Sequence, residues 1–414
     1  MSSAPQAIFG FKPDELSGLL NRRVVEIHAS EAAFLWLQRT RASMSPHFKL
    51  KHLAKLDARV MAHLAGLLVA GDFGIKVAQQ GLEEGDPASV FVLSYLAVCH
   101  DKHATMAHVL QLAQGHGDLA HAVCDAMAWA APAQRVLLAR KLMASPVASH
   151  RCVGITALAS NHEAGPQDLA VHLRDADPLV RGAALRASAG YALDWTAYRD
   201  DPDDACRLWA ASAAVFQGQA QGGRVAWDIV CRSPDLARAA IRVVMRCGDD
   251  ALARDMIRTL ASLPEQRRLA VVACGEFGDP ATVPWLLSLL DDPVLARVAG
   301  EALAMLSGAD LIYLDLDRDP PDDAPDAHPQ DGDLPWPDSQ AIQLWWQLAQ
   351  ARFTSGHRYV GGHALSAAGT EMVLKDGFQR QRAGAAFEMA RLVPGTRLFN
   401  VQARADVQAW RQVL

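Results

Sequence analysis

Five histidines that lie close together in the chain are the residues best suited to metal chemistry. They are His100, His103, His108, His116 and His121. Imidazole nitrogens are common zinc ligands, and His100 and His103 would share one face of a helix. No cysteine pair and no matching spacing of carboxylates accompanies them, although Asp101 is adjacent. We therefore predict exposed or locally bonded histidines, with no metal ligands among them.

Motifs for covalent or acid-base catalysis are missing from the sequence. It contains no GxSxG elbow, no phosphate-binding loop and no HExxH motif. The glycines of QGQAQGG (217–223) lie between expected helices, without the preceding strand that a dinucleotide fingerprint requires. We predict no catalytic residues, no cofactor and a protein that is not an enzyme. An active site assembled from distant residues remains the alternative.

Arginine recurs at nearly constant spacing, at the start of successive expected helices. The six positions are Arg151, Arg181, Arg207, Arg238, Arg268 and Arg297, and subtraction gives separations of 30, 26, 31, 30 and 29. One arginine per repeat along a common edge could bind phosphates. An arginine just after an acidic turn can instead bond the turn of its own or the adjacent repeat. We interpret this arginine ladder as structural.

Aromatic and basic residues gather near the C-terminus and indicate a protein-binding surface. The candidate contacts are Trp336, Trp345, Trp346, Tyr359, Arg380 and Arg382. Residues 351–414 hold nine Lys or Arg against four Asp or Glu. Interfaces favour aromatic and arginine side chains, and we expect Arg380 and Arg382 to be exposed. In the alternative, these aromatics form the core of a packed cap, and a neighbouring acidic segment neutralises the basic residues.

The elements that would position these residues are best seen between Cys274 and Gly308. Asp279-Pro280 is a helix start, with an N-cap followed by proline at the first helical position. Asp291-Asp292-Pro293 ends that helix and begins another, which Gly308 ends. The apolar stripe of the second helix consists of Leu295, Ala299, Ala302, Leu303 and Leu306. Neither helix can bury its apolar face alone, so such units must stack.

The same start, stripe and stop recur upstream, which predicts an all-α array of two-helix repeats with a period of about 30 residues. Glycines end several copies, at Gly190, Gly218, Gly248, Gly278 and Gly308. We divide the chain into an N-terminal cap (1–48), the array (49–309), a linker (310–338) and a C-terminal cap region (339–414). The linker carries ten aspartates and one arginine, which predicts a solvated segment.

Composition excludes several other classes of protein. A chain of 414 residues, half of them hydrophobic, can bury a large core, and its net charge of -6 argues against a surface built for nucleic acid. Seven widely spaced cysteines without a CxxC pair indicate buried thiols in a reducing compartment. No signal peptide and no membrane span is apparent. We expect a soluble, cytoplasmic protein.

The repeats resemble HEAT-like repeats, the two-helix units of α-solenoids, most specifically in LVRGAALRA (179–187) and GDPATVPWLLSLLDDPVLARVAGEAL (278–303). The whole chain resembles an uncharacterised bacterial HEAT-repeat family often encoded beside type VI secretion genes. The segments that carry this second resemblance are KLDARVMAHLAGLLVAG, LPWPD, RFTSGHRYVGG, GFQRQRAGAAFEMA and LFNV. The resemblance implies a secretion-associated role without implying a mechanism.

Together these observations predict a non-catalytic scaffold that binds another protein, such as a secretion component or effector, as an adaptor or immunity protein. Two other classes stay open. Some bacterial DNA glycosylases are built from similar repeats, but they would need a continuous basic face. The other class is an enzyme of the lyase or hydroxylase type, because the short repeats resemble those of phycobilin-lyase-type proteins. Some HEAT-repeat hydroxylases bind two irons through several His-Glu pairs, whereas only His162-Glu163 occurs here.

Overall fold

The computed structural model describes residues 20–411, apart from residues 83–84, 323 and 327. These described residues are mostly helical, with only two-residue strands between some of the helices. The all-α fold predicted from the repeats is therefore confirmed, and the exact repeat period stays a prediction. The described chain forms two compact units, of which the first comprises residues 20–41, 51–165 and 403–411 and the second residues 42–50 and 166–402. Their boundary near residue 165 falls inside the predicted array, and the predicted N-terminal cap lies partly outside the described residues.

The first unit is built from helices that pack on aromatic side chains. Its helices are α2 (Arg22–Ala42), α3 (Leu50–Val69), α4 (Gly71–Gln80), α5 (Pro87–Cys99), α6 (His103–Leu112), α7 (Gly117–Trp129), α8 (Pro132–Met143), α9 (Ala148–Ser160) and α22 (Ala405–Arg411). Trp36 stacks on Phe91 with ring centroids 4.8 Å apart, and Trp129 meets Phe91 edge-on at 5.5 Å. Such pairs stabilise a core beyond the area that they bury.

The second unit contains the clearest repeats. Its helices are α10 (Pro166–Leu169), η2 (His172–Arg174), α11 (Pro178–Ala187), η3 (Trp195–Tyr198), α12 (Asp204–Phe216), α13 (Gln221–Arg232), α14 (Pro234–Met245), α15 (Asp250–Ser262), η4 (Pro264–Gln266), α16 (Arg267–Phe277), η5 (Pro280–Thr282), α17 (Val283–Ser288), α18 (Ala296–Ser307), α19 (Ser339–Ala349), η6 (Gln350–Arg352), α20 (Ala367–Asp376) and α21 (Gln379–Leu392). Helix α13 packs on α14, α15 on α16, and α16 on both α14 and α18.

The predicted helix starts are visible as side-chain caps. Asp177 accepts a hydrogen bond from Leu179 N at 2.9 Å, and Asp279 accepts one from Ala281 N at 3.0 Å. In the first unit, Asp86 caps α5 in the same way. Each cap satisfies backbone N–H groups that have no partner within their own helix. The Asp-Pro signals therefore mark real helix starts.

The predicted stops are equally clear, because all five glycines adopt positive φ. The values are 92° for Gly190, 75° for Gly218, 87° for Gly248, 76° for Gly278 and 74° for Gly308. This left-handed conformation ends a helix and is costly for any residue with a Cβ. Glycine is the residue type that these turns require.

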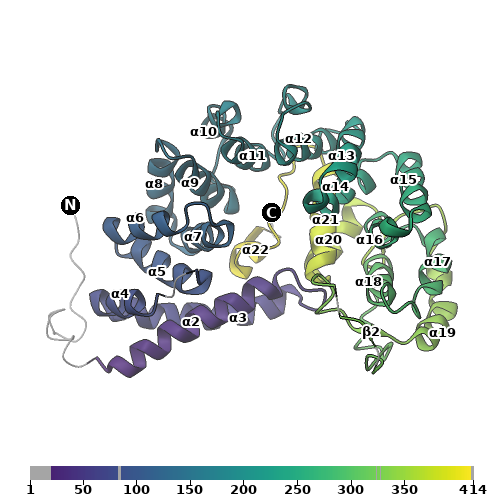
Figure 1. Cartoon of the computed structure of the whole chain (residues 1–414), viewed down its shortest axis with the longest axis horizontal. Helices are drawn as coiled ribbons and strands as arrows, with labels where there is room; N and C mark the ends of the chain where they lie inside the picture. Colours follow the sequence, from purple (N-terminus) through teal and green to yellow (C-terminus); the bar gives the residue numbers. More distant parts are fainter. Residues whose placement is uncertain (1–19, 83–84, 323, 327, 412–414) are drawn as a thin grey trace. The chain divides into compact units, whose positions relative to one another are not determined.

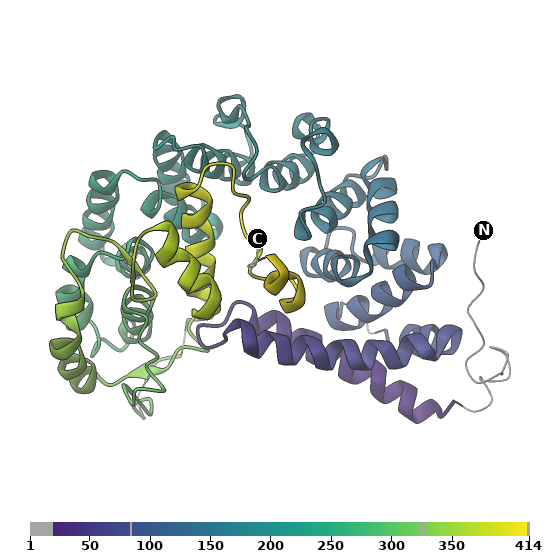
Figure 2. The same ribbon diagram turned by 180° about the vertical axis from the view of Figure 1, so that it is seen from behind.

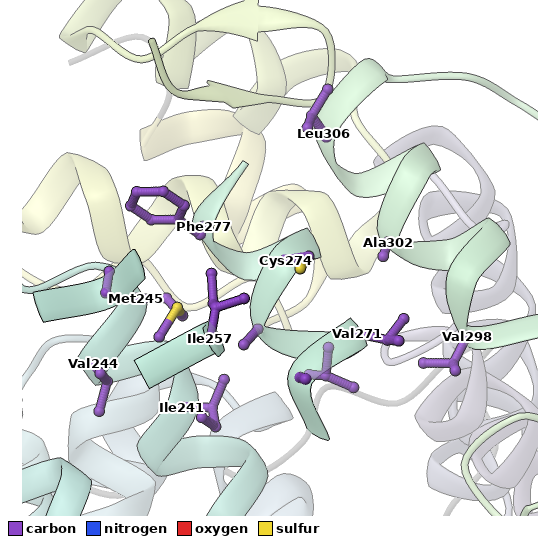
Figure 3. Close-up of a cluster of buried hydrophobic side chains, with 14 of the residues drawn as sticks. Ile241, Val244, Met245, Ile257, Val271, Cys274, Phe277, Val298, Ala302 and Leu306 are labelled. Carbon is purple, nitrogen blue, oxygen red and sulfur yellow. The ribbon is translucent and has the colours of Figure 1, made fainter. Parts of the chain in front are cut away.

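A continuous apolar core joins the second helices of the array (Figure 3). It contains Ile241, Val244 and Met245 from α14, Val271, Cys274 and Phe277 from α16, and Val298, Ala302 and Leu306 from α18. The predicted stripe of α18, from Leu295 to Leu306, is buried at every position. Stacking of neighbouring helices thus covers faces that single units would leave exposed.

The acidic segment is less solvated than predicted for a linker. Strand β1 (Asp317–Arg318) pairs antiparallel with β2 (Trp336–Pro337), and Leu311, Leu316 and Leu334 are buried. A second small hairpin is formed by β3 (Tyr359–Val360) and β4 (His363–Ala364). Figures 1 and 2 show α20 and α21 beside the array helices of the second unit. The acidic segment and residues 339–402 therefore belong to the packed body of this unit.

Candidate protein-binding surface

Large apolar side chains are exposed at the C-terminal end of the array. We call Ile312, Tyr313, Leu314, Leu344 and Leu348 the terminal apolar surface. Tyr313 is 83% exposed and Leu348 85% exposed. Exposed apolar side chains that form a contiguous patch mark protein contact sites, whereas single ones are common on any protein surface.

The loop after α18 holds its apolar side chains outward through its own hydrogen bonds. Leu314 N donates to Asp310 O at 3.0 Å, and Leu316 N donates to Leu311 O at 2.8 Å. Leu311 and Leu316 are buried and anchor the two ends of the loop. The residues between them, including Tyr313, are held outside the core by this closed turn. The loop therefore presents its tip without needing a partner to order it.

Helix α19 contributes the other part of the surface because it is apolar on two faces. Asp338 caps the helix by accepting a hydrogen bond from Ala341 N at 2.8 Å. Ile342 and Trp346 face the core, whereas Leu344 and Leu348, four residues apart, face away from it. One turn of helix thus exposes two leucines together.

The two parts are connected at the base of α19. Asp338 N donates a hydrogen bond to Leu316 O at 2.9 Å, which ties the end of the loop to the start of the helix. Leu316 and Ile342 belong to the same buried cluster. Asp315 is exposed beside the apolar side chains of the loop. The surface therefore combines apolar side chains with a negative charge at its edge.

The tryptophans predicted as partner contacts are largely part of the core. Trp346 is buried and stacks on Phe353 at 5.3 Å, and Trp345 lies partly buried beside it. Trp336 is buried in β2 below the guanidinium of Arg297. The prediction that Trp336 and Trp346 contact a partner is wrong, because both side chains are buried. They belong to the core of a packed cap, which was the alternative interpretation.

Tyr359 also has a structural position. It is partly buried, and its hydroxyl accepts a hydrogen bond from Thr354 N at 3.0 Å. Its own backbone N donates to Gly278 O at 2.8 Å, at the end of α16. Tyr359 therefore holds the segment after α19 against the array.

Arg380 and Arg382 are not the exposed contacts that the sequence predicts. Arg382 is fully buried, and its Nε donates to Leu374 O at 2.7 Å near the end of α20. Burial lowers the pKa of Arg382 to about 10. Arg380 is partly buried and forms an ion pair with Glu301, while its Nε donates to Met44 O at 2.8 Å. Both side chains are used to join elements of the second unit.

Sequence reasoning missed the terminal apolar surface, although a signal for it exists. The sequence of α19, SQAIQLWWQLA, places apolar residues on both sides of the helix. A helix with apolar residues on two faces leaves one of them exposed when only the other packs on the core. The sequence-based prediction chose Trp345 and Trp346 of this helix as contacts and did not include Leu344 and Leu348.

The six ladder arginines divide into two groups by their acceptors. Arg151, Arg181 and Arg207 each donate to backbone carbonyls in the segment that precedes their own helix. Arg181 also binds Asp201 through two hydrogen bonds of 3.0 and 2.8 Å. Arg238, Arg268 and Arg297 instead bind residues 330 and 331 of the acidic segment. The ladder is held by protein acceptors throughout.

Buried ion pairs connect α14, α16 and α21. Glu276 accepts from Arg242 Nη2 at 2.9 Å and from Arg246 Nη2 at 2.9 Å. Burial would raise the pKa of Glu276, but Arg242 and Arg246 outweigh it and lower that pKa to about 2. Glu388 is also buried, and its pKa is lowered by Arg358 and Arg246 despite its desolvation. Removing one member would leave an unpaired charge in the core.

In the described part of the chain, no group of three or more His, Cys, Asp or Glu is placed to hold a metal ion. His103 lies 3.3 Å from Asp101, and Glu163 is bound by Arg135. All seven cysteines are free, and burial raises the pKa of Cys206 and Cys274 to about 12. Thiols with such values are protonated and poor nucleophiles.

No single helix of the described residues is long and apolar enough to cross a bilayer. Only α3 and α4, which are bent by 114° relative to each other, reach the necessary length and composition as a pair. Searches for similar proteins found no match to a protein family, to a curated protein or to a solved structure.

Proposed function

We propose that this protein is a non-catalytic scaffold that binds another protein through its terminal apolar surface. The single observation that carries the proposal is the exposure of Tyr313, Leu344 and Leu348 on elements whose other faces are fixed in the core. Tyrosine and leucine side chains of this kind supply contact area at little entropic cost, because the elements that carry them are already ordered.

The chemistry of the surface defines the partner it would accept. An apolar patch in the partner would cover the two leucines and Tyr313, and a basic rim would complement Asp315. By the family resemblance, we place this partner among bacterial type VI secretion components or effectors, in the cytoplasm. Whether the scaffold works as an adaptor or as an immunity protein follows from the identity of that partner.

The contacts of the ladder arginines favour this proposal over nucleic-acid binding. Each of the six arginines already donates to a carbonyl or a carboxylate of the protein. A phosphate backbone would have to replace these acceptors one by one. The metal-dependent alternative gains nothing from the histidines, whose described neighbours form no ligand set.

Replacing both leucines by glutamate tests the proposal. Leu344→Glu/Leu348→Glu should abolish recovery of the partner from cells with an active type VI system and weaken the purified complex at least about tenfold. The two positions are exposed, so we expect the helical circular dichroism to stay unchanged. The measurement is affinity capture followed by calorimetric titration with the recovered protein.

Leu179→Glu is the matched control for this experiment. Leu179 on α11 is 56% exposed, as Leu344 is 57% exposed, but it lies on another helix of the same unit. The control should recover the partner as the unchanged protein does. Equal recovery by the double variant would show that the terminal apolar surface is not the binding site.

A further inference from the structure

A short acidic strap, residues 330–336, crosses the array and is held by the arginine ladder. Its central residue, Asp331, is only 2% exposed. Arg268 of α16 donates to both carboxylate oxygens of Asp331, each at 2.6 Å. A two-pronged arginine–carboxylate pair of this kind is strong and directional.

The neighbouring ladder arginines bind the strap on either side of this pair. Arg238 of α14 donates to Gln330 Oε1 at 3.1 Å, and Arg297 of α18 donates to Asp331 O at 3.4 Å. The guanidinium of Arg297 also lies 5.5 Å from the ring centre of Trp336. The strap is turned around Asp331, since Asp331 N donates to His328 O at 2.7 Å and Leu334 N donates to Asp331 O at 2.8 Å. Three successive repeats therefore bind one turned segment, each through its equivalent arginine.

The hydrogen bonds and ion pairs that the structure shows for Arg268 all go to Asp331. Without that carboxylate, a largely buried guanidinium would lose its counter-charge, which is unfavourable. Asp322 and Asp326 in the chain before the strap are exposed, as is Gln330 within it, whereas Leu334 and Trp336 of the strap are buried. Arg268 therefore favours an acidic side chain as its partner. A segment of another protein can supply this side chain as well as the strap can.

We propose that the ladder surface of α14, α16 and α18 binds acidic segments of a partner protein that adopt the turn of the strap, and that the acidic strap occupies this surface in competition with them. The arginines define the ligand: an acidic residue for Arg268, preceded by Gln or Glu for Arg238 and followed five residues later by an aromatic ring for Arg297. This proposal uses other residues than the terminal apolar surface and does not depend on the function proposed for it.

The test uses the full-length protein and a fluorescent peptide with the sequence of residues 326–337. Asp331→Ala should bind this peptide at least tenfold more tightly than the unchanged protein does, because the variant vacates the carboxylate position. A peptide with Asn in place of the Asp that corresponds to Asp331 should bind the variant no more tightly than it binds the unchanged protein. Fluorescence anisotropy measures both affinities. Equal binding by the variant and the unchanged protein would overturn the proposal.

Two further variants separate recognition from general attraction between charges. In the Asp331→Ala protein, Arg268→Glu should abolish peptide binding. Arg258→Glu, at an exposed arginine of α15, should leave it unchanged. Equal losses in both variants would contradict specific recognition by the ladder. Leu344→Glu/Leu348→Glu should keep its peptide binding, so this proposal and the scaffold proposal can fail independently.

A measurement on the unchanged protein covers the case in which Asp331→Ala does not fold. An excess of the peptide should speed amide hydrogen exchange in residues 328–336, because it displaces the strap from the arginines. Exchange in α14 and α16 should not increase. Unaltered exchange in the strap at saturating peptide would refute the competition.

Discussion

At the scale of single residues, the arginines of the second unit hold together segments that are far apart in the chain. Arg246, directly after α14, binds Glu276 of α16 and Glu388 of α21 within the core. Each buried ion of this kind needs opposite charges beside it, since its desolvation costs roughly several kcal/mol. Their value to the fold lies in specifying which segments meet.

Removing the charge of Glu276 should therefore destabilise the protein strongly. Glu276→Gln leaves Arg242 and Arg246 without their shared carboxylate, and we expect a loss of about 3–5 kcal/mol in the free energy of unfolding at neutral pH. Urea denaturation measures this loss. The exposed Glu265→Gln is the control and should change stability by less than about 0.5 kcal/mol. A similar small change for Glu276→Gln would contradict the structural role of the pair.

The same carboxylate predicts a dependence of stability on acid pH. The pKa of Glu276 is about 2 in the folded protein and has an ordinary value of 4.5. The unfolded chain therefore binds more protons between these values, so the free energy of unfolding falls as pH decreases from about 4.5 toward 2. Glu276→Gln should show a shallower fall across this range in denaturation curves. A fall of equal slope in both proteins would refute the assignment.

At the scale of elements, the ends of two array helices are closed by a distant segment. Gly361 N donates to Met305 O at 2.8 Å, and Gly362 N donates to Leu306 O at 2.9 Å at the end of α18. Arg358 Nε donates to Phe277 O at 2.9 Å at the end of α16. The last carbonyls of a helix have no partner within it, so these bonds complete both helices.

This close approach makes Gly278 more sensitive to substitution than other helix-ending glycines. A Cβ on Gly278 would lie 2.0 Å from Tyr359 O, whereas one on Gly218 would meet no atom within 4 Å. The two residues have nearly equal φ, 76° and 75°. Gly218→Ala should cost about 1–2 kcal/mol for the backbone conformation alone. Gly278→Ala should cost about 1–3 kcal/mol more from the clash.

Thermal and chemical denaturation of the two alanine variants measure this difference directly. Because the backbone conformations match, their difference reports the contact with residue 359. Equal destabilisation would show that the segment moves away at little cost, and that it does not close α16 tightly.

At the scale of the whole molecule, the end of the chain completes the first unit. Ala405 N donates to Asp57 Oδ2 at 2.7 Å, and Arg39 donates to Asp57 Oδ1 at 2.8 Å and to Ala403 O at 2.7 Å. Arg404 donates to Trp129 O at 2.9 Å. Helix α22 is thus joined to α2, α3 and α7, which precede it by hundreds of residues.

Truncation should therefore affect the two units differently. A chain that ends at Gln402 loses the hydrogen bond from Ala405 N to Asp57 and the one from Arg39 to Ala403 O, so amide hydrogen exchange in α2 and α3 should become faster. Exchange in α14 and α16 of the second unit should stay the same. Mass spectrometry of both proteins measures the effect by segment. Unchanged exchange in α2 and α3 would contradict the role of residues 403–411.

Local signals in the sequence determined much of the helical architecture. Asp279-Pro280, the glycines at positive φ and the stripe of α18 predict starts, stops and buried faces correctly, because caps and backbone conformations depend on neighbouring residues. Helix α20 was missed, since its sequence carries a weak apolar pattern.

Only the tertiary structure decided which polar and aromatic residues are buried and which apolar ones remain outside. Asp331 stands in an acidic run that reads as solvated, yet Arg268 holds it in the core. Trp346 is buried, whereas Leu348, two residues later, is exposed. Such outcomes depend on partners dozens of residues away, and local sequence patterns contain no record of those contacts. For the same reason, the all-α repeats were predictable and the candidate surfaces were not.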